Sequence, residues 1–405
     1  MEAEELQREA NAMQEQLIRI RRVLHAHPET GFDLSNTKLL VKQELQDMGY
    51  QPIDCGRSGL FVLAGGKRPG KTFLLRADMD ALPVREETKL DFASVNGNMH
   101  ACGHDLHTTM LLGAARLLKK YEENIEGTVK LMFQPAEEIL EGARDMIENG
   151  ILENPRVDGA FMIHVMTDVP LAPGTVVIPS KGVSAPAADM FTITIFGKGC
   201  HGSSPDEGVD PLNVAAHILL AMQEIPSREL AIQDEAVLTI GTMHGGMAPN
   251  VIPDTVAMGG SLRAYDEQIR EFIKKRLKEI TAGVAQTFRA EAEVVFASGC
   301  PTLINEEGMV EHAVRCAREL LGQENVLSAG QLQGAGKKSG GSEDFSYISQ
   351  KVPSVMAALA AGQADQGHGY PLHHPRVTFD EEVLATGSVL YAYMAMQWLV
   401  EQKDR

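Results

Sequence analysis

Short apolar runs alternate, along the first half of the chain, with segments in which apolar residues recur at helical spacing. The runs at 72–77, 127–134 and 159–165 predict buried strands, because each is short and almost continuously apolar. Helical spacing in the first 25 or so residues and in 106–119 predicts helices. Strands that alternate with helices indicate an α/β fold with a mostly parallel sheet.

Residues from about 187 to 297 follow a different pattern, in which strands also come in direct succession. The segments 190–197, 236–243, 255–264 and 292–297 predict strands, and 210–225 and 267–288 predict helices. The resulting order, β-α-β-β-α-β, is that of a ferredoxin-like unit. Because α/β segments resume after Gly299, we expect a first domain of residues 1–186 and 298–405, into which a second domain, 187–297, is inserted. A final helix is expected at about 380–403.

Length, charge and cysteine content narrow the class of protein. With 405 residues, 44% of them hydrophobic, the chain is long enough for two domains with a core each. A formal net charge of −18 argues against nucleic-acid binding, which needs a basic surface. Five well-separated cysteines argue against a disulfide framework and favour a reducing compartment. The acidic, polar start has no basic head followed by an apolar run, so we expect no signal peptide there. No stretch reaches the roughly 18 consecutive apolar residues of a membrane span. We expect a cytoplasmic protein.

The segment 99–107, MHACGHDLH, carries three histidines, a cysteine and an aspartate. Cys102 and His104 are separated by one residue and can turn toward one point. Thiolate and imidazole are ligands that zinc and its first-row neighbours prefer. A purely structural role is an alternative, because free cysteines are commonly buried as apolar residues and a histidine can simply begin a helix. The nearby Asp105 and His107 favour a cluster of ligands.

Further candidate ligands lie where strands are expected to end. They are Asp78, Asp80, Glu137, Glu138 and His164. In open α/β sheets, ligands bind beyond the carboxyl ends of the strands, so these side chains are expected at one edge with Cys102 and His104. We expect the glutamate pair to open a helix after Pro135, where it could instead complement the helix dipole. His164 could instead be a core histidine with a hydrogen-bond partner.

Two late segments are less specific. The histidine pair in 370–375, YPLHHP, supplies either a ligand or part of a surface loop. Ser342 in GSEDF could cap a helix. The glycines between Gly334 and Gly341 indicate either backbone held close to another group or a flexible loop.

These motifs resemble those of the M20 metallopeptidases, and among them the amidohydrolase branch of aminoacylases, hippurate hydrolases, auxin-conjugate hydrolases and N-acetyl-diaminopimelate deacetylases. The matching motifs are HPETGF at 27–32, RADMDALPV at 76–84, MHACGHDLHT at 99–108, FQPAEE at 133–138, HGSSPDEGVDP at 201–211, GGMAPNVIP at 245–253, GSEDF at 341–345 and LHHP at 372–375. They span nearly the whole chain in the family's order. ACGHD and QPAEE are the most specific.

The resemblance implies a metal centre. Its ligands would be Cys102, His104, Glu138, His164 and His373. Glu137 takes the place of the general base, Asp80 that of a carboxylate that steers a ligand, and Asp78 replaces a histidine ligand of other branches. Because one catalytic zinc must keep an open position, five ligands are better used by two divalent ions roughly 3.5–4 Å apart. We expect zinc or manganese, and cobalt or nickel also accept these donors.

The resemblance also makes the inserted domain a lid and dimerisation domain, which implies a homodimer or higher homo-oligomer. His201 matches a histidine that reaches the reacting carbonyl, in its own or in the partner subunit's site. Asn250 and Arg263 match positions that face the substrate, and Arg263 would pair with its carboxylate. The branch often has a histidine where this chain has Asp206, a difference that bears on substrate preference.

We therefore expect a metal-dependent amidohydrolase that cleaves N-acyl amino acids, a small-molecule substrate, with metal-activated water and Glu137 as the general base. A dipeptidase or carboxypeptidase of the same family is an alternative, because the same centre cleaves any suitably held amide. A non-catalytic metal-binding module is a third possibility. The presence of Glu137 beside Glu138 argues against it, because a binding module needs no base.

Overall fold

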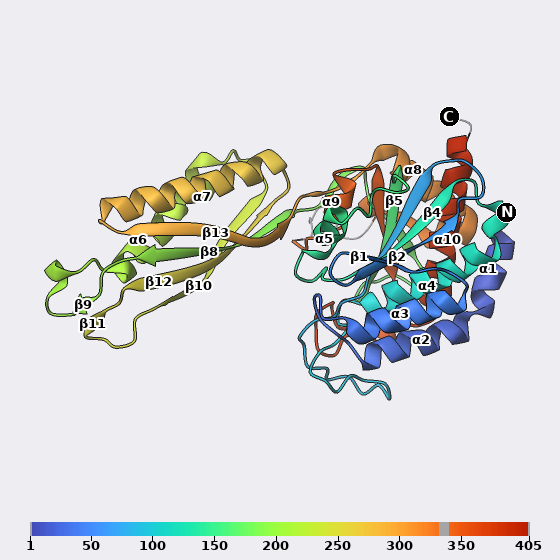
Figure 1. Ribbon diagram of the computed structural model, residues 1–405, viewed down its shortest axis with the longest axis horizontal. Helices are drawn as coiled ribbons and strands as arrows, with labels where there is room; N and C mark the ends of the chain where they lie inside the picture. The colour runs from blue at the N-terminus through green and yellow to red at the C-terminus, as the bar shows by residue number, and fades with distance from the viewer. Residues whose placement is uncertain (1, 332–339, 404–405) are drawn as a thin grey trace. The chain divides into compact units, whose positions relative to one another are not determined.

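The computed structural model describes residues 2–331 and 340–403, which form two compact units (Figure 1). Unit 1 contains the described residues of Met1–Ser184, Ile304–Lys338 and Tyr347–Arg405, and unit 2 those of Ala185–Leu303 and Ser339–Ser346. Each unit has its own hydrophobic core. The glycine-rich segment that begins at Gly334 lies mostly outside the described residues.

Unit 1 is built on an eight-stranded sheet with the order β1-β2-β4-β3-β5-β16-β6-β15. The strands are β1 (Ile53–Cys55), β2 (Gly59–Gly65), β3 (Thr72–Asp78), β4 (Thr128–Gln134), β5 (Gly159–Met166), β6 (Val176–Ile178), β15 (Val326–Ser328) and β16 (Ser354–Ala360). The central strands β4, β3, β5 and β16 are mutually parallel, whereas β1, β2 and β6 each pair with a neighbour antiparallel. The expected mostly parallel sheet is confirmed.

Helices and short 3-10 turns cover this sheet. They are α1 (Ala3–Ala12), α2 (Gln14–Ala26), α3 (Ser35–Asp47), α4 (His104–Lys120), η1 (Glu122–Asn124), α5 (Gly142–Glu148), α8 (Glu307–Leu321), η4 (Gln323–Asn325), η5 (Ala329–Gln331), η6 (Ala364–Gln366) and α10 (Val383–Lys403). The expected N-terminal helix is two helices that meet at Met13. A one-turn helix, α9 (Ser346–Ser349), begins too late for Ser342 to cap it.

The apolar helix α10 belongs to the core of unit 1. It is long and apolar enough to cross a membrane by length and composition, but 83% of its apolar window is buried. Glycines let it approach α4 closely, because a Cβ on Gly387 would collide with Met110, and a Cβ on Gly113 would collide with Ser388. This contact fixes α4, whose N-terminus carries the Cys102–His104 segment.

Unit 2 is a four-stranded antiparallel sheet with the order β10-β12-β8-β13, and helices pack on it. Its elements are β8 (Ala187–Phe196), β9 (Cys200–His201), η2 (Pro205–Glu207), α6 (Pro211–Met222), the π-helical turn η3 (Ile225–Glu229), β10 (Ala236–Gly245), β11 (Val251–Ile252), β12 (Thr255–Ala264), α7 (Glu267–Thr287) and β13 (Glu291–Cys300). β9 and β11 form a separate two-stranded ribbon. β7 (Gly182–Ala185) pairs with β14 (Leu303–Asn305) where the chain passes between the units. The expected ferredoxin-like order is confirmed.

The position of the core predicts how leucine substitutions act on stability. Leu111 on α4 is fully buried, whereas Leu39 on α3 is 65% exposed. We expect Leu111→Ala to lower the free energy of unfolding by about 2–5 kcal/mol, because it leaves a cavity. Leu39→Ala is expected to change it by less than about 0.5 kcal/mol. Urea unfolding followed by the fluorescence of Trp398, the only tryptophan, reports on unit 1. Equal losses in both variants would contradict this placement of the core.

Candidate metal centre

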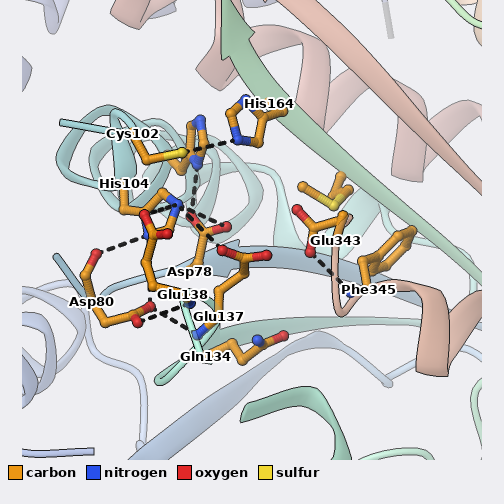
Figure 2. Close-up of polar contacts among 12 residues, drawn as sticks. Asp78, Asp80, Cys102, His104, Gln134, Glu137, Glu138, His164, Glu343 and Phe345 are labelled. Atoms are coloured by element: carbon orange, nitrogen blue, oxygen red, sulfur yellow. Dashed lines mark hydrogen bonds and ion pairs between the residues drawn. The ribbon is translucent and has the colours of Figure 1, made fainter. Parts of the chain in front are cut away.

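Side chains able to bind a metal gather where the central strands of unit 1 end and α4 begins (Figure 2). Among the described residues, five groups each offer donor atoms that lie within 4.8 Å of one another. Three of them contain the expected ligands: Cys102, His104 and His164; Cys102, Glu138 and His373; and His104, Glu137 and Glu138. The other two are Asp78, His104 and His107, and Glu137, Glu343 and Asp344. The structure thus brings together the five side chains that the sequence suggested as ligands. Their binding of a metal stays a prediction.

His104 presents a lone pair to this cluster. Its Nδ1 donates to the backbone oxygen of Asp80 at 2.8 Å, which leaves Nε2 without a proton in the neutral ring. Nε2 is buried and has no hydrogen-bond partner among the described residues. It lies 3.7 Å from Asp78 Oδ2, 3.9 Å from Glu137 Oε2 and 3.8 Å from Glu138 Oε1. Atoms that share one cation, each roughly 2 Å from it, are separated by about this much. His104 Nε2 and Glu138 Oε1 are therefore spaced as two ligands of one divalent ion, with the carboxylates of Asp78 and Glu137 beside them.

His164 and Cys102 face each other with a nitrogen and a sulfur that can both bind a metal. His164 Nδ1 donates to the oxygen of Val165 at 2.6 Å, which leaves Nε2 directed toward Cys102 Sγ, 3.5 Å away. Burial lowers the pKa of His164 to about 3, so its ring is neutral and suited to bind a metal. Burial raises the pKa of the Cys102 thiol, and a nearby cation would favour the thiolate.

A tight turn, and not the expected helix, carries Glu137 and Glu138. The helix expected after Pro135 is wrong, because α5 begins only at Gly142. Its place is taken by a turn that includes two left-handed residues, Ala136 at φ 56° and Leu140 at φ 57°. These glutamates therefore cannot complement the dipole of a helix that starts with them.

Asp80 fixes the orientation of this turn. Its Oδ1 accepts from the backbone N–H of Glu137 at 3.0 Å, and its Oδ2 accepts from that of Glu138 at 3.1 Å. Its backbone oxygen holds His104, as described above. One residue thus positions both glutamates and one imidazole, which agrees with a steering role for Asp80.

The charges of the cluster are coupled through its carboxylates. Burial raises the pKa of Glu138 to about 7. Burial disfavours the charged form of His104, but the negative charge of Asp78, with Cys102 and Asp80, raises its pKa well above the usual range. Protons held in this way compete with a cation, so a metal would displace them on binding.

Asp78 has protein donors on both of its oxygens. His107 Nδ1 lies 2.6 Å from Oδ1, and Arg76 Nη1 lies 2.7 Å from Oδ2. Burial opposes its charge, but His104, Arg76 and His107 hold its pKa well below the usual range. These contacts favour a supporting role for Asp78 over that of a ligand. Arg76 was not singled out in the sequence; its signal was a charged residue inside an otherwise apolar run.

His373 reaches the cluster from the loop before α10. It adopts the left-handed conformation, at φ 66°, and its backbone N–H donates to the oxygen of Ala101 at 2.9 Å. Its Nε2 lies 3.7 Å from Glu138 Oε2. His374 instead stacks on Tyr370, with 4.4 Å between ring centroids. This arrangement supports the choice of His373 over its neighbour.

A buried charged network anchors the N-terminus of α4 behind the cluster. Asp105 Oδ2 accepts from Arg21 Nε at 2.8 Å and lies 2.8 Å from His25 Nδ1. Burial opposes ionisation of Asp105, but Arg21 and His25 hold its pKa far below the usual range. Breaking a buried pair leaves an uncompensated charge, so this network fixes α2 against α4.

The candidate residues of unit 2 lie in two places. His201 on β9 pairs with Val251 on β11, and Asn250 accepts from the N–H of Gly202 at 2.8 Å, so His201 and Asn250 are neighbours. β12 begins at Thr255, shortly after β11. Arg263 lies near the far end of β12, eight residues from Thr255, which corresponds to roughly 25 Å of strand. Asp206 lies in η2 and is exposed.

Residues 74–397 match the peptidase family M20/M25/M40. The N-acetyl-L-cysteine deacetylase of Bacillus subtilis is 36% identical over 399 residues, which cover 97% of this chain and 90% of that protein. Thermostable carboxypeptidase 1 of Saccharolobus solfataricus is 35% identical over 402 residues, which cover 98% of this chain and 98% of that protein. The crystal structure of the Bacillus subtilis YXEP protein, a dinuclear metal binding peptidase from the M20 family, aligns with a TM-score of 0.78 at 32% identity, over 96% of this chain and 99% of that one.

Removal of the Cys102 thiol tests the candidate centre. We expect Cys102→Ala to lower the metal content of the purified protein, because it deletes a donor atom. Cys55→Ala is the matched control, since Cys55 is another buried thiol of unit 1, and it donates to the carbonyl oxygens of Met146 and Asn149. Elemental analysis measures both. Equal metal content in the two variants would exclude Cys102 as a ligand.

Proposed function

Because this chain belongs to the peptidase family M20/M25/M40, and is thus a hydrolase, we propose that it is a metal-dependent amidohydrolase that removes the acyl group from N-acyl amino acids. The observation that carries this proposal is the buried Nε2 of His104, which has no partner among the described residues and is ringed by carboxylate oxygens at 3.7–3.9 Å. The deacetylase relative, 36% identical, supports the substrate class.

Metal ligands in this proposal are the five side chains named above. They are Cys102, His104, Glu138, His164 and His373. We propose two divalent ions, zinc or manganese, with cobalt or nickel also acceptable to these donors. Such ions would supply the chemistry of lowering the pKa of a water molecule and polarising an amide carbonyl. The similarity to the YXEP protein, a dinuclear metal binding peptidase, supports two ions.

Glu137 is the general base of the proposed reaction. It would take a proton from the attacking water and pass it to the departing amine. Its Oε2 lies 3.9 Å from the Nε2 of His104, so it is beside the proposed ligands. Asp80 holds its backbone N–H and therefore limits where its carboxylate can point.

Residues of unit 2 would bind the substrate and stabilise the developing oxyanion. We propose that His201 stabilises the oxyanion and that Asn250 and Arg263 bind the substrate. The guanidinium of Arg263 suits the substrate's carboxylate. A small molecule cannot touch both His201 and Arg263 of one unit 2, because the length of β12 separates them. This separation supports a homodimer in which the partner supplies one of them.

All five cysteines are free, which supports a cytoplasmic location.

The role of Glu137 is tested by its removal. We expect Glu137→Ala to retain metal but to lower kcat by about 10²–10⁴-fold, because proton transfer loses its acceptor. Glu141→Ala is the matched control, since Glu141 lies in the same turn and pairs with Arg57 at the surface. Steady-state kinetics with saturating metal compare the two variants. Substantial turnover by Glu137→Ala would remove this residue from the role of base.

Substrate class is tested against the carboxypeptidase alternative, which the 35% identical relative favours. Metal-stripped protein is supplied with zinc, manganese, cobalt or nickel in turn. It is then assayed with N-acetyl, N-benzoyl and long-chain acyl amino acids, and with dipeptides and N-blocked peptides. We expect the highest kcat/KM on an acyl amino acid. A higher kcat/KM on peptides would make the protein a peptidase.

A further inference from the structure

Strands β3 and β5 separate just before the candidate metal centre. They pair in parallel as far as Arg76 and Met162, and there the pairing stops. β3 nevertheless continues to Asp78, paired with β4, and β5 continues to Met166, paired with β16. The sheet therefore opens between the strand that ends at Asp78 and the strand that carries His164.

Two side chains bridge this opening one after the other. The hydroxyl of Tyr391 accepts from the N–H of Ile163 at 3.0 Å and donates to the oxygen of Arg76 at 2.8 Å. Two residues further along β5, His107 Nε2 accepts from the N–H of Val165 at 2.9 Å. A buried N–H without an acceptor is costly, so these side chains replace the missing strand.

His107 has one defined tautomer in this position. Because Val165 donates to Nε2, the proton of the neutral ring is on Nδ1, which donates to Asp78 Oδ1 at 2.6 Å. Both ring nitrogens are thus used, which argues against His107 as a metal ligand. His107 links the end of β3 to the end of β5 at a fixed distance.

The ring of His107 also stands between two proposed ligands. Its centroid lies 5.3 Å from that of His104 and 4.7 Å from that of His164. The Val165 that it holds accepts from His164 Nδ1 through its own backbone oxygen. On the other side Val165 packs so closely on Gly103 that a Cβ there would collide with it. Movement of His107 would therefore change the direction in which His164 presents Nε2.

We propose that His107 is a positioning residue that sets the separation of His164 from His104, and thus the geometry of the two-ion centre. The inference rests on the proposed function, because it needs these histidines to bind metal. Asp78 acts through His107 in this arrangement: it fixes the ring tautomer and supplies charge, and it does not bind an ion. Tyr391 is the other bridge, but it is farther along the strands from the proposed ligands.

Three variants separate positioning from general stability. His107→Phe keeps a ring but loses both hydrogen bonds. His107→Gln keeps a donor and an acceptor about as far apart as the two ring nitrogens. Tyr391→Phe removes only the hydroxyl bridge between Ile163 and Arg76. Unfolding of each metal-stripped protein, followed by Trp398 fluorescence, shows whether it folds. If the Phe variant does not fold, His107→Leu replaces it, because it also loses both hydrogen bonds.

Cobalt titration of the stripped proteins gives the number of bound ions, their Kd and the visible absorption of the cobalt centre. We expect the wild type to bind two ions, and His107→Phe to bind at least one of them about 10–100-fold more weakly, with a changed spectrum, as is typical when a group that orients a ligand is lost. His107→Gln should restore most of the affinity. Tyr391→Phe should lose stability but keep the wild-type cobalt affinity and spectrum.

Three outcomes would contradict these claims. Unchanged cobalt affinity and spectrum in His107→Phe would overturn the positioning role alone. Equal loss of affinity in His107→Phe and Tyr391→Phe would also overturn it, because the effect would then follow from stability. A wild type that takes up no cobalt would overturn the proposed metal-dependent function, and this inference with it.

Discussion

The buried carboxylate of Asp80 is the group on which the arrangement of the candidate centre depends. It accepts from two successive backbone N–H groups, those of Glu137 and Glu138, while its backbone oxygen orients His104. Buried carboxylates are stable only when donors or cations compensate them. Asp80 is compensated by backbone donors, whereas Glu138 keeps one buried oxygen without a partner among the described residues. The fold thus provides donors for Asp80, which positions the other groups. It leaves a buried oxygen of Glu138 that a cation could bind.

Much of the fold could be predicted from the sequence, because the relevant signals are local. Continuous apolar runs gave β3, β4 and β5, since parallel strands are buried on both faces. The ferredoxin-like order of unit 2 followed from strands with alternating apolar residues and from two helical segments, one of them long and amphipathic. The gathering of donors at one edge followed from the general rule for open α/β sheets, with the resemblance to a known family supplying the individual residues.

The parts that could not be predicted depend on tertiary contacts. Nothing local indicates that residues after Pro135 form a left-handed turn, since Ala136 has no preference for that conformation; the turn exists because Asp80, 57 residues away, takes its N–H groups. The role of His107 is equally hidden. Its spacing from His104 places both on one face of α4, but only the divergence of β3 from β5 gives it partners on both sides.

Backbone strain lies next to the proposed ligands and base. Ala136 precedes Glu137, and His373 is itself left-handed, a conformation that costs of order 1–3 kcal/mol for a residue with a side chain. Such strain persists only where neighbouring contacts enforce it. The loop of His373 is held by the bond from its N–H to Ala101, next to Cys102, and by the bond from Glu87 N–H to the oxygen of Pro375 at 2.8 Å. The segment that carries Cys102 therefore orients His373 toward the cluster. A site assembled in this way pays its conformational cost during folding, so a cation needs little further ordering of the chain when it binds.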